Sequence, residues 1–107
     1  MVQKWYIHRD NDQPAIIWTD GSKYWYQNNL LHRDNDKPAA IYSNGDKCWY
    51  QNGLLHRDND EPAVIFAHGH LKWYQNGLLH RDSPNKPAII FANGNQSFYQ
   101  YGKYINR

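Results

Sequence analysis

A segment of 24 residues recurs along most of this chain. The motif His-Arg-Asp begins at His8, His32, His56 and His80, each 24 residues after the last. Repetition at a fixed period is typical of arrays in which each unit packs only against its neighbours. We therefore expect a single repeat domain over residues 1–107. It consists of units 8–31, 32–55, 56–79 and 80–104, a partial capping unit at 1–7 and a tail at 105–107.

Each unit contains two dipeptides that favour hairpin turns. The first set is Asp20-Gly21, Asn44-Gly45, His68-Gly69 and Asn93-Gly94. The second set is Asn28-Asn29, Asn52-Gly53, Asn76-Gly77 and Tyr101-Gly102. Such dipeptides between β-prone runs favour two-residue type I′ turns, and no segment has a helical pattern. The sequence predicts an all-β fold, in which tandem antiparallel hairpins form an elongated, twisted single sheet.

The expected turn also predicts which side chains share a face. A two-residue turn at Asp20-Gly21 pairs Ile17 with Tyr24 and Ile16 with Trp25, and paired residues lie on one face. One face then carries residues that are nearly invariant between units, namely Ala15, Ile17, Tyr26, Leu31 and their equivalents. The other carries an aromatic ladder of Trp18, Trp25, Tyr42, Trp49, Phe66, Trp73, Phe91 and Phe98. We expect the invariant face to be the core and the aromatic ladder to be a groove or contact face. The alternative is that the tryptophans only cover their face and bind nothing.

The repeated polar residues argue against catalysis. Catalytic residues are usually unique in a chain, whereas nearly every polar residue here recurs in each unit, so we expect no enzyme. His-Arg-Asp also occurs in kinase catalytic loops, but those need an Asn seven residues after the His, where this chain has Ala or Pro. We interpret the motif as part of an ionic ladder, in which Arg33 lies near Asp10 or Asp34.

Metal binding is not expected either. Asp10-Asn11-Asp12 and its repeats begin like a calcium loop, but the turn glycine and the distal Glu of such loops are missing. Histidines of successive hairpin units should lie about 10–14 Å apart at a strand spacing of about 4.8 Å, which is too far to share one zinc ion. Cys48 is the only cysteine. We therefore expect no cofactor and no metal.

Charge and composition narrow the classes of partner. Lys and Arg total 12 and Asp and Glu total 10, and a net charge of +2 gives no strong field for nucleic acid. Five Trp and nine Tyr distinguish the chain from a disordered one. No apolar run approaches the roughly 20 residues of a membrane span, and the N-terminal residues do not resemble a signal peptide. We expect a cytoplasmic protein.

The first unit resembles the MORN repeat. The similarity lies in an aromatic residue two positions before Asp-Gly, then Lys-Tyr, a second turn dipeptide and a His, which here are Trp18, Asp20-Gly21, Lys23-Tyr24, Asn28-Asn29 and His32. The resemblance implies tandem hairpins in an elongated sheet, a scaffold or contact role, and contact with phospholipids as proposed for some members. A weaker similarity is to cell-wall choline- and glucan-binding repeats, whose aromatic cages bind cations or sugars.

Together these features predict a non-catalytic interaction or scaffold module. We expect it to bind a protein partner, or a second copy of itself, through the aromatic ladder together with His32 and His56. A small-ligand, glycan or cation-binding repeat with Trp/Tyr cages is the alternative, and phospholipid contact is a lesser one.

Overall fold

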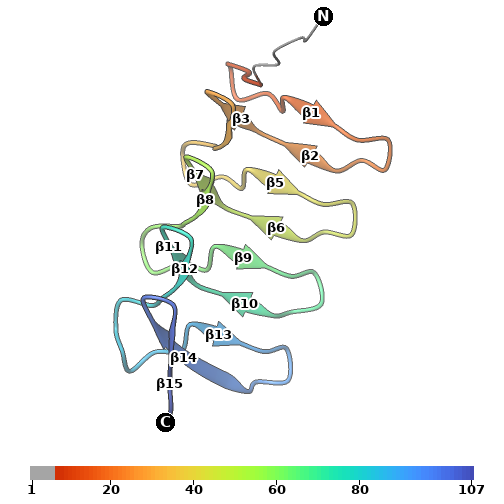
Figure 1. Cartoon of the computed structure of the whole chain (residues 1–107). Helices are drawn as coiled ribbons and strands as arrows, with labels where there is room; N and C mark the ends of the chain where they lie inside the picture. Colours follow the sequence, from red (N-terminus) through yellow and green to blue (C-terminus); the bar gives the residue numbers. More distant parts are fainter. Residues whose placement is uncertain (1–6) are drawn as a thin grey trace, which may run out of the picture.

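The structure is a computed structural model that describes residues 7–107, and its regular elements are all strands (Figure 1). Unit one contains β1 (Ile16–Ile17), β2 (Lys23–Tyr24), β3 (Tyr26–Gln27) and β4 (Leu30–Leu31). Unit two contains β5 (Ala40–Ile41), β6 (Lys47–Cys48), β7 (Tyr50–Gln51) and β8 (Leu54–Leu55). Unit three contains β9 (Val64–Ile65), β10 (Leu71–Lys72), β11 (Tyr74–Gln75) and β12 (Leu78–Leu79). Unit four contains β13 (Ile89–Ile90), β14 (Gln96–Gln100) and β15 (Lys103–Ile105). The predicted all-β hairpin architecture is confirmed.

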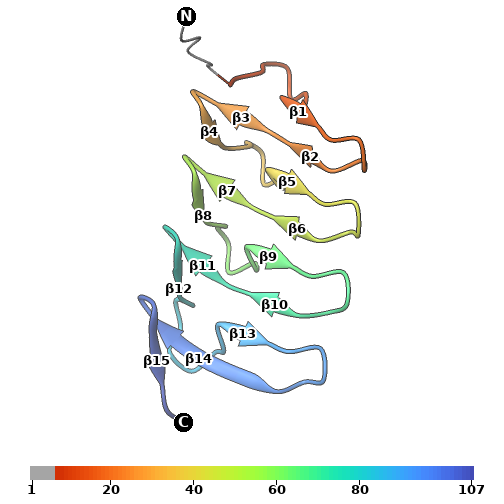
Figure 2. The same cartoon turned by 45° about the vertical axis from the view of Figure 1, so that its right-hand side comes forward.

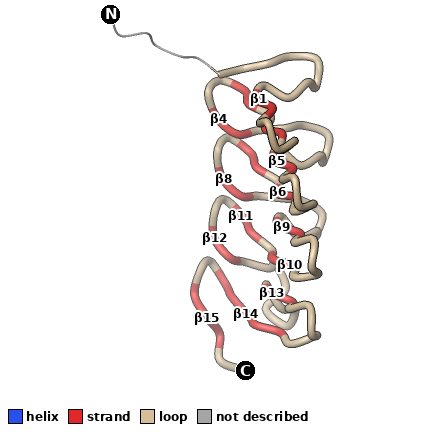
Figure 3. Tube along the Cα trace, turned by 90° about the vertical axis from the view of Figure 1, so that its right-hand side faces the viewer, coloured by secondary structure: helices blue, strands red, loops and turns tan. Residues whose placement is uncertain are grey.

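Most strands belong to one open antiparallel sheet. Its nine strands follow the order β1-β2-β5-β6-β9-β10-β13-β14-β15, so the first hairpins of successive units pair side by side. Three further hairpins, β3–β4, β7–β8 and β11–β12, form separate two-stranded sheets that rise at an angle from one side of the array (Figures 2 and 3). The resulting molecule measures 54 × 28 × 25 Å. Apart from Ile7, the predicted capping unit lies outside the described residues. No helix in the described part is long and apolar enough to cross a membrane.

The turns at the second hairpins are the predicted ones. Asn52 and Gly53 have φ angles of 51° and 82°, and both central residues of a type I′ turn require positive φ. Tyr50 pairs with Leu55 across this turn. The prediction of two-residue turns is therefore confirmed for this set.

The turns at the first hairpins differ from the prediction by one residue. Ile16 pairs with Tyr24 and Ile17 with Lys23. The loop holds three residues, 19–21, because Trp18 N donates to the Ser22 carbonyl at 2.9 Å. Three-residue loops that end on a glycine with positive φ are common in hairpins, and Gly21 has φ 95°. A slip of one residue moves every side chain of a strand to the opposite face, so the predicted face assignment is wrong.

This slip divides the expected aromatic ladder into two groups. Trp25, Trp49 and Trp73 are each only 6% exposed and form the core together with Ala39, Ala63 and Ala88, which are 0% exposed. The expectation that these tryptophans line an open contact face is therefore wrong. Burial is confirmed for these three alanines but not for Ala15, which is half-buried, and the expected core residue Ile17 is 61% exposed.

The other ladder members, apart from Phe98, lie on the side that faces the second hairpins, which we call the inner face. Along it the paired residues Ala40, Cys48, Val64 and Lys72 follow one another from strand to strand. The aromatic residues two positions beyond the inner-face strand residues are Trp18, Tyr42, Phe66 and Phe91. The outer face carries an alternating row of Ile17, Lys23, Ile41, Lys47, Ile65, Leu71 and Ile90.

Candidate functional site

Each buried tryptophan lies beneath an arginine from the next unit. The Arg33 guanidinium carbon is 3.7 Å from the centroid of the Trp25 ring. Arg33 Nε donates to Asp12 Oδ1 at 2.8 Å and its Nη1 donates to the Pro38 carbonyl at 3.1 Å. Trp25 Nε1 donates to the Asp12 carbonyl at 3.1 Å. The same set recurs as Asp36–Arg57–Trp49 and Asp60–Arg81–Trp73.

This arrangement confirms an ionic ladder and corrects its partner. Arg33 binds Asp12 of the preceding unit rather than the expected Asp10 or Asp34. Hydrogen bonds from Arg33 and Lys37 hold the pKa of Asp12 well below its ordinary value, and Arg57 lowers that of Asp36 in the same way. Since the guanidinium and the loops cover these rings, the ladder joins units and leaves little of the tryptophan surface for a partner.

The last unit completes the ladder with a residue from the tail. Phe98 stands where other units have Trp, and the Arg107 guanidinium carbon lies 4.8 Å from its ring centroid. Arg107 also donates to the Pro84 carbonyl and to Asn85 Oδ1. The predicted tail therefore packs on the fourth unit, and Arg107 takes the place that Arg33 has in the first.

The two histidines expected at the contact face are held by hydrogen bonds within their own units. His32 Nδ1 accepts from the backbone N–H of Asn52 at 3.0 Å, so Nε2 carries the proton and donates to Asp34 at 2.8 Å. His56 makes the equivalent bonds, from Asn76 N at 3.1 Å and to Asp58 at 2.8 Å. These partners hold the two rings in place between neighbouring hairpins.

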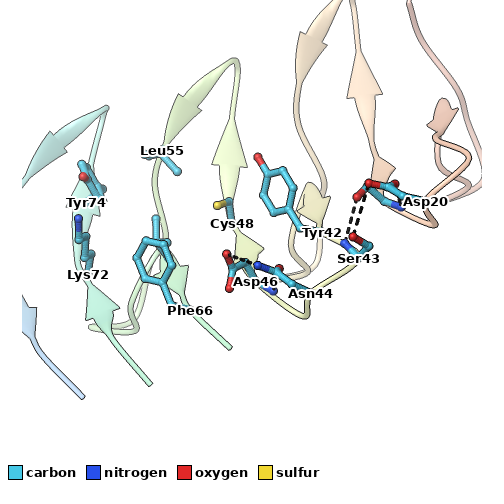
Figure 4. Close-up of a pocket in the computed structure, with 12 residues that line it drawn as sticks. Asp20, Tyr42, Ser43, Asn44, Asp46, Cys48, Leu55, Phe66, Lys72 and Tyr74 are labelled. Carbon is cyan, nitrogen blue, oxygen red and sulfur yellow. Dashed lines mark hydrogen bonds between the residues drawn. The ribbon is translucent and has the colours of Figure 1, made fainter. Parts of the chain in front are cut away.

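The inner face contains a pocket of about 520 Å³, which we call the inner pocket (Figure 4). It lies between the first hairpins of the first three units and residues of the second hairpins. Its walls are formed by Tyr42, Cys48, Leu55, Val64, Phe66 and Tyr74. Its polar lining includes Asp20, Ser43, Asn44, Asp46 and Lys72. Two smaller polar pockets, of about 320 and 240 Å³, lie between successive His-Arg-Asp loops.

The walls of the inner pocket are neutral at physiological pH. Burial raises the pKa of Tyr42 to about 12, and the Tyr42 ring meets that of Tyr24 edge to face at 5.7 Å. Burial, with a smaller effect of the nearby Asp46 carboxylate, raises the pKa of Cys48 to about 11. A thiol with such a raised pKa is a poor nucleophile, because the reactive species is the thiolate. The pocket therefore presents aromatic and apolar surface rather than a reactive sulfur.

Two carboxylates give the inner pocket its negative charge. Asp20 Oδ1 accepts from the backbone N–H of Ser22 at 2.9 Å, and Asp46 Oδ1 accepts from that of Ala67 at 2.7 Å. Among the aspartates of residues 7–107, only these two have no Lys, Arg or His nitrogen beside the carboxylate. Within the same residues Lys72 has no acidic partner, and its Nζ lies 5.5 Å from the centroid of the Phe66 ring.

The described residues contain no group of three His, Cys, Asp or Glu side chains that could hold a metal ion. The calcium-like segments are already engaged internally, because Arg33 and Lys37 bind the Asp12 carboxylate. Asn11 and Asp12 have φ angles of 65° and 56°, so this segment forms a tight turn between units.

Sequence reasoning found two aromatic residues of the inner pocket, Tyr42 and Phe66, and missed its charged residues. It placed Lys23 beside the aromatic ladder because the first turn was taken as one residue too short. The alternation of Ile17, Lys23, Ile41 and Lys47 on paired strands was the available signal. A three-residue loop puts these lysines on one exposed row and the tryptophans inside, which is the energetically favourable arrangement.

The chain was compared with known proteins at the levels of family, sequence and structure. No protein-family model, curated protein or solved structure matches it.

Proposed function

We propose that this chain is a non-catalytic binding module that holds a segment of a protein partner in the inner pocket. The observation that carries the proposal is the pocket itself, whose volume of about 520 Å³ lies within the range of known ligand sites. Mostly apolar walls with a few polar groups are the usual composition of such sites. The proposal keeps the interaction role expected from the sequence and transfers it from the buried tryptophans to the inner face.

Aromatic side chains support a protein partner. Tyr42 and Phe66 are partly exposed in the pocket. Aromatic residues are enriched at protein interfaces and often dominate their energetics. A role in phospholipid contact has less support, because Asp20 and Asp46 place negative charge at the pocket. The likeness to MORN repeats fits a contact module built from tandem hairpins.

A peptide-display selection tests this proposal. Random peptides are selected on the wild-type chain and then measured against the double variant Tyr42→Ser/Phe66→Ser. The matched control is Trp18→Ser/Phe91→Ser, which removes two aromatic residues of the same row outside the pocket. We expect selected peptides to bind wild type and control alike, and to lose at least about tenfold in affinity with the pocket variant. The proposal is overturned if the selected peptides bind the pocket variant as tightly as wild type, or if the selection yields no binders.

The single cysteine gives a second measurement that needs no substitution. Cys48 lines the pocket, so a bound peptide should slow its reaction with a small thiol reagent. The reaction is run with and without each selected peptide. Unchanged reaction rates at saturating peptide would place the binding site elsewhere, even if the pocket variant failed to fold.

A further inference from the structure

The charges at the inner pocket define the chemistry of its ligand. Resting on the proposed function, we infer that the pocket recognises a peptide through one lysine or arginine side chain. The aliphatic stem packs against the Tyr42 ring, and the cationic head group is attracted by the carboxylates of Asp20 and Asp46.

The first support is that both carboxylates can still accept hydrogen bonds. Hydrogen bonds from Ser22 lower the pKa of Asp20, so this group is anionic at neutral pH. Asp46 Oδ2 accepts from Asn44 Nδ2 at 3.2 Å, and its Oδ1 accepts from a backbone N–H. An ionised carboxylate has about four acceptor positions. Each group therefore retains capacity for an ammonium or guanidinium donor.

The second support is that each of the other aspartates in residues 7–107 has an Arg, Lys or His side chain as a partner. Asp12, Asp36 and Asp60 bind arginines, and Asp10, Asp34, Asp58 and Asp82 bind histidines. The positions equivalent to Asp20 and Asp46 in the other units are Asn, His or Ser. Within the described part of the chain, the aspartates without such a partner are thus confined to the two hairpin tips at this pocket.

The third support is that the chain already contains this arrangement of a cation, a carboxylate and an aromatic ring. A guanidinium between a carboxylate and an aromatic ring occurs at Arg33, Arg57 and Arg81. A cation near an aromatic face is attracted by the ring quadrupole. Lys72 already lies near the Phe66 ring, so the Tyr42 end of the pocket is the end that suits a cation. An acceptor group of the same peptide, such as a backbone carbonyl, can then meet Lys72.

The test compares two synthetic probes that differ in charge. One is acetyl-Gly-Leu-Arg-Leu-Gly-amide, and the other has citrulline, a neutral isostere, in place of arginine. Binding to the wild-type chain is followed by NMR titration. We expect the arginine probe to bind at least about fivefold tighter, which corresponds to about 1 kcal/mol for a partly exposed ion pair. Equal affinities, or no binding of the arginine probe, would overturn the inference.

Variants then locate the effect. Asp20→Asn/Asp46→Asn keeps the Oδ1 acceptors and removes both charges, and it should reduce the arginine preference to less than about twofold. Asp34→Asn/Asp58→Asn makes the same change in net charge outside the inner pocket and should leave the preference intact. If both pairs reduce it equally, the preference reflects net charge and the inference is wrong.

Failure of this inference can be distinguished from failure of the proposed function. Peptides from the display selection that depend on Tyr42 and Phe66 but contain no essential Lys or Arg would leave the binding module standing. They would refute the basic side chain as its ligand.

Discussion

Arg33 lies over the Trp25 ring, with the guanidinium carbon 3.7 Å from the ring centroid. The same guanidinium binds the Asp12 carboxylate and the Pro38 carbonyl, so one side chain joins two inter-unit loops to a buried ring. This geometry explains why Arg, Asp and Trp recur together at fixed spacing, since each unit supplies one part of a contact that its neighbour completes. Several consequences can be measured.

The first concerns the tryptophans. Trp49 is 6% exposed and its Nε1 donates to the Asp36 carbonyl at 3.0 Å. Trp49→Ala should lower the free energy of unfolding by about 3–5 kcal/mol, as for other large core aromatics. Trp18→Ala, at a residue that is 56% exposed, should change it by less than about 1 kcal/mol. Urea unfolding followed by circular dichroism measures both. Equal losses of unfolding free energy in the two variants would contradict the assignment of Trp49 to the core and of Trp18 to the exposed surface.

The arginine ladder gives a second prediction. Arg57→Ala removes the cover of Trp49 together with charge-assisted hydrogen bonds to Asp36 and the Pro62 carbonyl. Arg57→Ala should lower the free energy of unfolding by about 2 kcal/mol. Arg57→Lys keeps the charge but not the planar fork, and should lose most of the same amount.

The matched control for the ladder is Arg9→Lys. Arg9 belongs to the same motif but is exposed and stacks on no ring within residues 7–107. Its replacement should leave the urea midpoint almost unchanged. If Arg57→Lys changes the urea midpoint as little as Arg9→Lys does, the role given to the Arg57 guanidinium is wrong.

The architecture was accessible from the sequence because the repeat is strict and Asn-Gly turns specify hairpins locally. Asn52 and Gly53 adopt the positive φ angles that their residue types favour. The face assignment failed because Asp-Gly and Asn-Gly fit both two- and three-residue loops. Only packing of the whole array decides between these, since a shift of one residue exchanges Trp25 with Tyr24 between the core and the inner face.

The inner pocket was less accessible for a different reason. Asp46 and Tyr74 belong to different units and to hairpins inclined to one another, and both line the pocket. The angle between the main sheet and the second hairpins brings them together, and no local pattern encodes that angle. The exceptions to the repeat were the useful signal, because Asp20 and Asp46 stand where other units carry neutral residues or histidine.

Acid sensitivity follows from the ladder carboxylates. Arg57 holds the pKa of Asp36 below its ordinary value of 3.8, and the pKa of Asp60 is lowered by Arg81. A pKa that is lower in the folded state stabilises the fold fully above the ordinary value, and this contribution is lost as the pH falls through the folded value. Stability should therefore decrease below about pH 4.

The variant Asp36→Asn isolates one ladder carboxylate. It should be less stable than wild type at pH 7 and should lose less on acidification, so that the two urea midpoints converge as the pH falls through the lowered pKa of Asp36 in the folded state. Midpoints that fall in parallel with the pH would show that the Asp36–Arg57 pair does not contribute to the acid sensitivity.

One unit lacks a cation that two others have, and restoring it should stabilise the array. Lys37 Nζ lies 2.8 Å from Asp12 Oδ2 and Lys86 Nζ lies 3.1 Å from Asp60 Oδ2, whereas Glu61 stands at the equivalent place beside Asp36. Glu61→Lys should raise the free energy of unfolding by up to about 1 kcal/mol, since the pair is partly exposed. Glu61→Gln, which only removes the like charge, should gain less. Urea unfolding at 0.05 M and 1 M sodium chloride tests the mechanism, because high salt screens an exposed pair and should bring the two variants together. A gain that is equal in both variants at low salt would mean that relief of repulsion, and not a new ion pair with Asp36, stabilises the chain.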